Sequence, residues 1–125
     1  MALTPDAYKT LEAIVGLENI SQEPVVLDGY TFHFMAELIK ATGGTRFMPY
    51  RPEAVLLPGS TEEVQAIVKV CNRLGIMFKP TSTATGPWNA ASQEGVVIID
   101  LMRMNRIVEI DEKNMYAVVE PFVSQ

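Results

Sequence analysis

The residues best suited to binding chemistry lie together in one stretch, residues 79–92. They are small, hydroxylated or turn-forming, with one large aromatic, Trp88. Backbone N–H groups in a close turn, together with Ser and Thr hydroxyls, can donate hydrogen bonds to a ligand, and phosphate oxygens are natural acceptors. An ordinary polar connection has a similar composition. Composition alone therefore leaves two interpretations, a phosphate-binding turn and a plain polar loop.

The elements on either side favour the binding interpretation. Apolar runs at residues 75–78 and 96–99 predict two buried strands. Earlier in the chain, residues 54–58 predict another fully apolar strand, and residues 61–74 predict a helix. A strand, a helix and a strand form a βαβ unit, in which the strands are parallel and the crossover is right-handed. Ligands bind such sheets beyond the carboxyl ends of the strands, which is where residues 81–92 begin.

The helix predicted over residues 61–74 has clear signals at both ends. Ser60 and Glu63 form a capping-box pattern, in which the Ser60 hydroxyl accepts from the Glu63 N–H while the Glu63 carboxylate reaches back. Gly75 ends the helix. Apolar residues recur on one face at Val64, Ile67, Val68, Cys71 and Leu74.

The first fifty residues carry weaker signals. Thr4 and Pro5 predict the start of a helix that ends at Gly16. Residues 17–22 are predicted to be a polar connection, residues 24–29 a short extended piece that ends in a turn, and residues 32–41 a short second helix.

The end of the chain alternates polar and apolar residues in two arms, residues 107–110 and 116–120. Asp111-Glu112-Lys113-Asn114 lies between the arms and predicts a turn, so the segment is expected to form a β-hairpin. The whole chain is thus expected to adopt an α+β fold: a βαβ unit with a small, mostly parallel sheet, helices packed on it, and a hairpin after it.

Bulk composition excludes several classes of protein. With 125 residues, 48% hydrophobic and 20% charged, the chain resembles one globular domain. A formal charge of −5 and the lack of a basic cluster argue against nucleic-acid binding. No apolar run is long enough to span a membrane. The N-terminus does not resemble a signal peptide, and the single cysteine excludes an internal disulfide, so we expect a cytoplasmic protein.

Conventional catalytic groups are missing from the sequence. One histidine, His33, and one cysteine, Cys71, cannot form a usual zinc site. Cys71 falls in a helical pattern and is interpreted as a small core residue, and His33 as a packing or surface residue. No nucleophile elbow, Walker loop or His-Glu-x-x-His motif is present. We therefore predict no catalytic residue and no metal site.

Three ordered stretches resemble a known family. They are RPEAVLLPGSTEEV at residues 51–64, VIIDLMRMNRIVEID at residues 97–111 and AVVEP at residues 117–121. Their order and spacing resemble the FAD-binding domain of the glycolate oxidase and D-lactate dehydrogenase type, in the vanillyl-alcohol oxidase or PCMH flavoprotein superfamily. The resemblance divides the chain into a helical lead-in, residues 1–49, and the first part of a PCMH-type FAD-binding domain, residues 50–125.

The resemblance implies a role for the loop after the second strand. In the family, backbone amides of this loop hold the FAD pyrophosphate, and here that role falls on Pro80, Thr81, Ser82, Thr83, Ala84, Thr85 and Gly86. The early glycines of the family are replaced by Ser, Thr and Ala, and the family arginine after the proline is Thr81, with Lys79 as the nearest cation. Hydroxyl groups also donate to phosphate. Because no residue matches a covalent flavin link, we expect non-covalent FAD.

The resemblance also implies an activity. It suggests the FAD-binding portion of a flavin-dependent oxidoreductase, a dehydrogenase of a small 2-hydroxy acid such as D-lactate or glycolate. Relatives continue into a substrate-binding domain, so these 125 residues alone are not expected to turn over substrate. Many relatives pass electrons to an electron-transfer flavoprotein or an iron–sulfur subunit. The alternative is a degenerate βαβ interaction or scaffold module that no longer binds FAD, and the glycine-poor loop favours it.

Two further expectations concern the last third of the chain. Arg103 and Arg106 are predicted to be structural, in surface ion pairs next to Asp100 and Glu109. The hairpin arm at residues 116–123 has no neighbour to cover it within this sequence, so the chain is expected to self-associate.

Overall fold

The computed structural model describes residues 3–31, 50–83 and 91–124. The predicted helix at residues 32–41, with His33, lies outside the described residues, as do Trp88 and three predicted site residues, Ala84, Thr85 and Gly86. In chain order the elements are α1 (Pro5–Val15), the 3-10 helix η1 (Leu17–Asn19), β1 (Ile20–Ser21), α2 (Pro24–Gly29), β2 (Ala54–Leu56), α4 (Thr61–Leu74), β3 (Met77–Thr81), β4 (Val96–Asp100), β5 (Ile107–Asp111) and β6 (Tyr116–Val119).

The main sheet has four strands in the order β1-β2-β4-β3. Strands β2 and β3 each pair with β4 in parallel, while β1 pairs with β2 in antiparallel fashion. The predicted βαβ unit, β2–α4–β3, is therefore present with parallel strands. Its two strands are not neighbours, because β4 is inserted between them.

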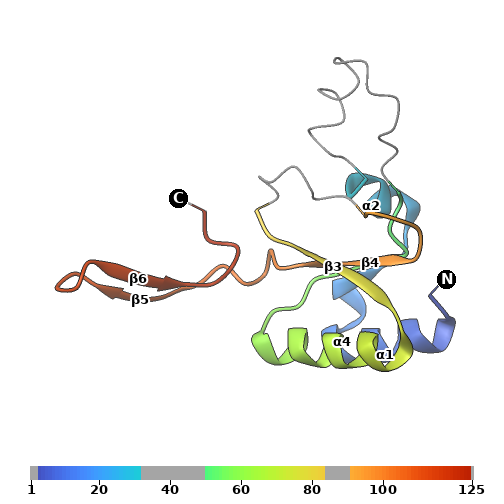
Figure 1. Cartoon of the computed structure of the whole chain (residues 1–125), viewed down its shortest axis with the longest axis horizontal. Helices are drawn as coiled ribbons and strands as arrows, with labels where there is room; N and C mark the ends of the chain where they lie inside the picture. The colour runs from blue at the N-terminus through green and yellow to red at the C-terminus, as the bar shows by residue number, and fades with distance from the viewer. Residues whose placement is uncertain (1–2, 32–49, 84–90, 125) are drawn as a thin grey trace, which may run out of the picture.

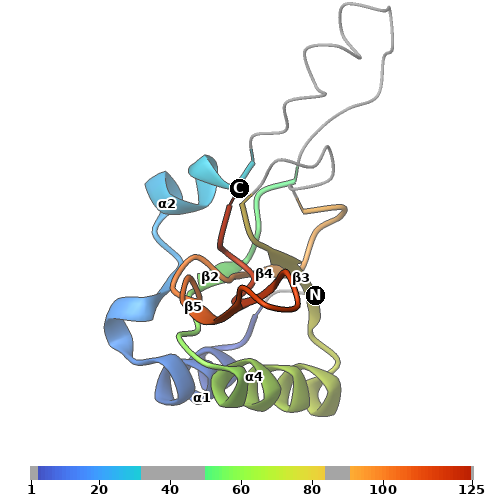
Figure 2. The same ribbon diagram turned by 90° about the vertical axis from the view of Figure 1, so that its left-hand side faces the viewer.

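Helices cover both faces of this sheet. Figures 1 and 2 show α1 and α4 side by side under one face and α2 over the other. Side chains along β4 point alternately to the two faces of the sheet. Val97 and Ile99 pack in the core cluster with α1 and α4. Val96 and Ile98 pack on the other face, in the cluster with Leu27 of α2. Strand β4 is buried on both faces, as its unbroken apolar sequence predicts.

Helix α4 follows its sequence signals closely. The Ser60 hydroxyl accepts a hydrogen bond from the Glu63 N–H at 3.2 Å, and the Glu63 carboxylate accepts one from the Gly59 N–H at 2.8 Å. Gly75 ends the helix in the left-handed conformation, which a glycine adopts without strain. Cys71 is fully buried in the core under the sheet, as predicted, and burial raises the pKa of its thiol.

Helix α2 corrects the predicted extended piece at residues 24–29. The three apolar residues of its sequence suggested a strand, but only Leu27 is buried, while Val25 is 80% exposed. Pro24 is suited to the first helical position, and the Glu23 carbonyl accepts from the N–H groups of Val26 and Leu27. One buried position in a short turn of helix is enough to cover the second face of the sheet at this point.

The predicted polar connection at residues 17–22 is also corrected. It contains η1 and then β1, which pairs with β2 through Ile20 opposite Leu56. Ile20 is buried in the core with α1 and α4. A two-residue strand has no periodicity to detect, so the local sequence could not predict it.

Strand β3 differs from its prediction in length and position. It extends through Pro80 and Thr81, both of which were assigned to the loop, and it is only partly buried. It forms the edge of the sheet, beside β4 alone. An edge strand tolerates Pro80 because it has no second neighbouring strand that would need a hydrogen bond from the N–H group that proline lacks.

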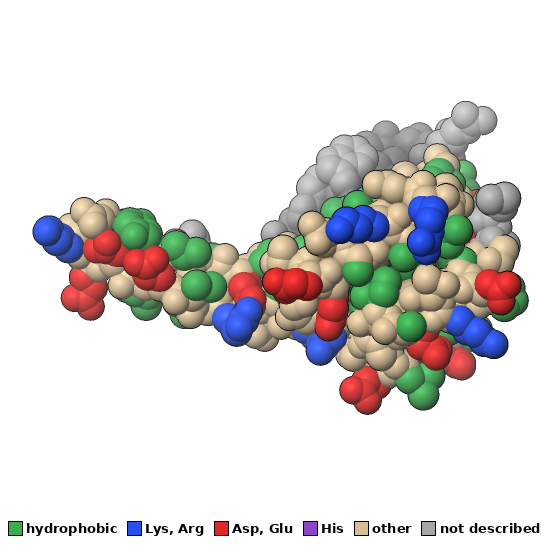
Figure 3. All heavy atoms as spheres, turned by 90° about the horizontal axis from the view of Figure 1, so that it is seen from below, with side chains coloured by type: hydrophobic (Ala, Val, Ile, Leu, Met, Phe, Trp, Pro, Cys, Tyr) green, Lys and Arg blue, Asp and Glu red, His purple; other side chains and the backbone are tan. Residues whose placement is uncertain are grey.

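The predicted hairpin forms from β5 and β6 and projects away from the rest of the molecule (Figures 1 and 3). Cross-strand pairs place Ile107 opposite Val119 and Ile110 opposite Ala117 on one face. On the other face Tyr116 donates a hydrogen bond to Glu109 at 3.3 Å. One side of this arm is therefore apolar, and its side chains are exposed.

Candidate site at the carboxyl end of the sheet

Two residues at the ends of neighbouring parallel strands begin the site. Thr81 is the last residue of β3 and Asp100 the last of β4, and they are Cα partners in the sheet register. The Leu101 N–H donates to the Thr81 carbonyl at 2.9 Å, which holds the strand ends together. Partners in parallel strands point to the same face, so both side chains lie on the face covered by α2.

The Asp100 carboxylate is buried and fully engaged. Asp100 is only 7% exposed. Its Oδ2 accepts a hydrogen bond from the Tyr30 hydroxyl at 2.6 Å, and its Oδ1 accepts one from the Met102 N–H at 2.9 Å. A buried carboxylate needs such donors to replace the water it has lost.

Tyr30 reaches Asp100 from the end of α2, where it is the C-cap residue. Burial and the hydrogen bond to Asp100 raise the pKa of the Tyr30 phenol well above its ordinary value. The phenol therefore stays protonated at neutral pH and remains a hydrogen-bond donor to the carboxylate.

The Thr81 hydroxyl is the feature of this site that points to a ligand. Its Oγ1 atom is buried and has no hydrogen-bond partner among the described residues. A buried hydroxyl without a partner is costly, and an anionic ligand oxygen would satisfy its donor. This atom lies where the chain leaves the sheet toward the predicted pyrophosphate loop, so the residues present fit a phosphate group.

The other described members of the predicted site adjoin Thr81. Pro80 precedes it in β3, and Ser82 and Thr83 follow it in a bend. Lys79, the nearest cation, is on the same strand two residues before Thr81 and thus on the same face of the sheet. Burial lowers the pKa of the Lys79 ammonium.

The two arginines form structural contacts, but with partners other than those predicted. Arg103 lies 3.8 Å from the Glu63 carboxylate, and Arg106 pairs with Glu120 at 2.6 Å. The predicted neighbours were Asp100 and Glu109. Asp100 turns instead toward Tyr30, and the hairpin register places the carboxylate of Glu120 against Arg106.

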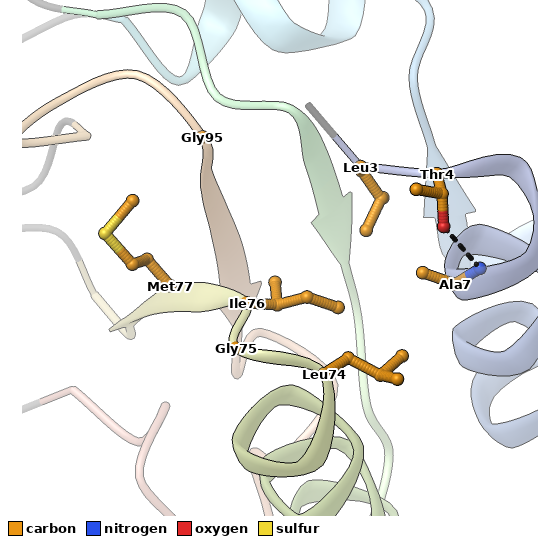
Figure 4. Close-up of a pocket in the computed structure, with 8 residues that line it drawn as sticks. All are labelled: Leu3, Thr4, Ala7, Leu74, Gly75, Ile76, Met77 and Gly95. Carbon is orange, nitrogen blue, oxygen red and sulfur yellow. Dashed lines mark hydrogen bonds between the residues drawn. The ribbon is translucent and has the colours of Figure 1, made fainter. Parts of the chain in front are cut away.

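A cavity of about 200 Å³ lies at the opposite end of the sheet (Figure 4). It is bounded by the start of α1, the end of α4 and the first residue of β3, and most of its lining is apolar. Its one hydroxyl, on Thr4, already accepts from the Ala7 N–H at 3.2 Å as the cap of α1. The side chains that line this cavity include no cation and no other hydroxyl for a phosphate, so it is not the candidate site.

Sequence reasoning did not identify Tyr30 or Asp100. Asp100 did carry a signal, because it is a charged residue at the end of an otherwise apolar run. Tyr30 carries none, since it follows residues 24–29, whose sequence predicts an extended piece and not the helix that the structure has. The two residues are 70 positions apart, and only packing of α2 on the sheet brings them together.

Within the described ranges, no group of three or more His, Cys, Asp or Glu residues could hold a metal ion. The helices of those same ranges are all too short or too polar to cross a membrane.

The fold defines a class of protein, the FAD-binding domains of flavin-linked oxidoreductases. The structure is similar to p-cresol methylhydroxylase with substrate bound, with a TM-score of 0.81 and 31% identity, over 95% of this chain and 22% of that one. It is also similar to 4-ethylphenol oxidase from Gulosibacter chungangensis, with a TM-score of 0.78 and 31% identity, over 94% of this chain and 22% of that one.

Sequence comparisons agree with the structural ones. Residues 52–125 match the family model described as FAD binding domain, and the chain belongs to this family, whose cofactor is FAD. Glycolate oxidase subunit GlcD of Bacillus subtilis is 33% identical over 97% of this chain and 24% of its own length. The flavoprotein subunit of 4-cresol dehydrogenase from Pseudomonas putida is 41% identical over 60% of this chain and 15% of its own length. The chain thus spans about a quarter or less of these relatives.

Proposed function

We propose that this chain forms the first part of the FAD-binding domain of a flavin-dependent dehydrogenase, in which the FAD pyrophosphate lies against Thr81, Ser82 and Thr83 and the turn that follows. The observation that carries the proposal is the buried Thr81 hydroxyl at the carboxyl end of β3, which has no hydrogen-bond partner in the described part of the chain. It is supported by the family match, which begins at residue 52 and includes the whole βαβ unit. Residues 1–49 are the lead-in to this domain.

The proposed substrate is a small 2-hydroxy acid, with D-lactate or glycolate as the class examples. Relatives named glycolate oxidase subunit GlcD and D-lactate dehydrogenase support this choice. The bound flavin would accept the hydride, while this chain holds the cofactor without a covalent link. Substrate-binding residues and the contact with an electron-transfer flavoprotein or iron–sulfur partner would belong to the rest of a longer protein, whose cytoplasmic location stays a prediction.

A second candidate is a scaffold module that no longer binds FAD. The loop after β3 favours it, because Ser, Thr and Ala replace the glycines that the family uses for close backbone approach. The Thr81 hydroxyl opposes it, since a domain without the cofactor has no reason to keep a buried donor unsatisfied.

We also propose that the 125-residue chain on its own self-associates through the β5–β6 arm. The apolar face of the arm consists of Ile107, Ile110, Ala117 and Val119, all of them exposed. Two-stranded hairpins are marginal in water without a partner surface, so a second copy would stabilise this one.

The cofactor test measures FAD uptake by the full-length protein that carries this sequence. The purified protein is expected to be yellow and to retain FAD on gel filtration. Thr81→Val, which removes the donor while keeping the shape, should weaken FAD binding about tenfold, whereas Thr81→Ser should retain it. Thr83→Glu should also weaken binding, because it sets negative charge against phosphate. A colourless protein that takes up no added FAD would favour the scaffold module.

A further inference from the structure

The Tyr30–Asp100 pair connects the lead-in of the chain to the candidate FAD site. Tyr30 lies outside the matched FAD-binding domain, which begins at residue 52. Its hydroxyl donates to Asp100 Oδ2 at 2.6 Å, and Asp100 is the sheet partner of Thr81. The lead-in therefore contributes a side chain to the group of residues around the proposed pyrophosphate contact.

Asp100 poses an electrostatic problem for a phosphate site. Its carboxylate is buried on the same face of the sheet as the Thr81 hydroxyl, one strand away. A carboxylate near a pyrophosphate repels it, and the repulsion is stronger where water is excluded. Asp100 is also the partner of Thr81 in the sheet register. If one of its carboxylate oxygens had no other donor, that oxygen would compete with a phosphate oxygen for the hydrogen bond from the Thr81 hydroxyl.

The observed hydrogen bonds prevent both effects. The two carboxylate oxygens accept from Tyr30 and from the Met102 N–H, and the Thr81 hydroxyl is left without a partner among the described residues. We propose that Tyr30 is a positioning residue for FAD: by donating to Asp100 it turns this carboxylate toward α2, and it keeps the Thr81 hydroxyl available to a phosphate oxygen. This inference rests on the proposed function, because it assumes that FAD binds at Thr81.

Two contacts fix Tyr30 in its place. Leu27 is buried against the sheet, which seats α2 on this face. Asp28 accepts a hydrogen bond at 2.7 Å from Nε of Arg51, the residue that precedes β2 by three positions. Because α2 is attached to the sheet both by apolar contact and by this ion pair, the Tyr30 hydroxyl reaches Asp100 from a defined direction.

The test compares FAD dissociation constants of the full-length protein, measured by flavin fluorescence on reconstitution of the apoprotein. Tyr30→Phe should weaken FAD binding about tenfold, the size expected for loss of a hydrogen bond to a charged group. Asp100→Asn alone should raise the affinity, because it removes a negative charge from beside the phosphate site. The double variant Tyr30→Phe with Asp100→Asn should bind within about threefold of the wild type, because the charge that Tyr30 restrains is gone.

A matched control comes from Tyr8, whose hydroxyl donates to the Ile20 carbonyl at 3.5 Å on the opposite face of the sheet. Tyr8→Phe should leave FAD affinity unchanged.

Wild-type protein that binds no FAD would contradict the proposed function itself. Wild-type binding with an unaffected Tyr30→Phe variant would overturn only this inference. The inference would also be overturned if the double variant bound FAD as weakly as Tyr30→Phe, because a merely structural role for Tyr30 predicts that result. A tenfold loss of FAD affinity in Asp100→Asn alone would overturn it as well.

Discussion

Arg103 Nη1 donates a hydrogen bond to the backbone carbonyl oxygen of Leu57 at 2.7 Å, which ties the turn after β4 to the end of β2. The same guanidinium lies against Gly59, where an added Cβ would come within 2.8 Å of Arg103 Nη2. It also lies 3.8 Å from the Glu63 carboxylate that helps to cap α4. Arg103 thus supports the junction of β2 and α4.

Replacing Arg103 should therefore affect stability and not cofactor binding. Arg103→Ala is expected to lower the free energy of unfolding by about 1 kcal/mol, since the lost bond is charge-assisted but partly exposed. Urea unfolding of the FAD-free protein gives this value, with Arg103→Lys as an intermediate control. A variant of unchanged stability that loses turnover would show that Arg103 acts in catalysis.

The capping box of α4 makes a second stability prediction. Ser60→Ala removes the acceptor for the Glu63 N–H and should cost about 1 kcal/mol. Ser60→Asp, which keeps an acceptor at the helix N-terminus, should cost much less. Thermal unfolding of the three proteins tests the ranking, and equal melting temperatures would argue that the cap contributes nothing.

The Tyr30 phenol predicts a loss of stability at high pH. Its pKa is raised in the folded protein above the ordinary value of 10.0, chiefly by burial and then by Asp100. The folded state therefore holds this proton more tightly than the unfolded chain. The resulting stabilisation is complete below about pH 10 and is lost as the pH rises through the folded pKa.

Melting temperatures measured between about pH 8 and pH 11, a range that includes the ordinary tyrosine pKa of about 10, test this directly. The wild type should lose stability above pH 10 more steeply than Tyr30→Phe does. Tyr8 also has a pKa raised by burial, and it is present in both proteins, so it does not affect the comparison. If melting temperature fell with pH equally in the two proteins, the pKa of Tyr30 would be the same in the folded and unfolded states, which would contradict the prediction.

Self-association of the 125-residue chain should depend on the apolar face of the β5–β6 arm. Its size, measured by light scattering across a concentration series, is expected to rise with concentration. Ile110→Lys, on the apolar face, should suppress the rise, whereas Val118→Lys, on the opposite face, should leave most of it. A strictly monomeric wild type at the highest concentration would refute the prediction.

The sequence by itself determined the elements whose signals are local. Helix α4 is encoded by its capping residues and Gly75, and β4 by five consecutive residues of which four are apolar. The hairpin is encoded by alternation around a turn. Each of these signals lies within a few residues of the structure that it specifies, because capping, turn formation and side-chain periodicity act at short range.

Only the tertiary structure decided how those elements combine. The sequence did not show that β4 separates β2 from β3, that α2 is helical, or that Tyr30 contacts Asp100. These features depend on packing between segments far apart in the chain: Leu27 is buried only because the sheet presents Val55 and Ile98 to it. The sequence was enough to propose a phosphate-binding role for the loop, from its place after a strand. The buried Thr81 hydroxyl and its engaged neighbour Asp100 required the folded register of β3 and β4.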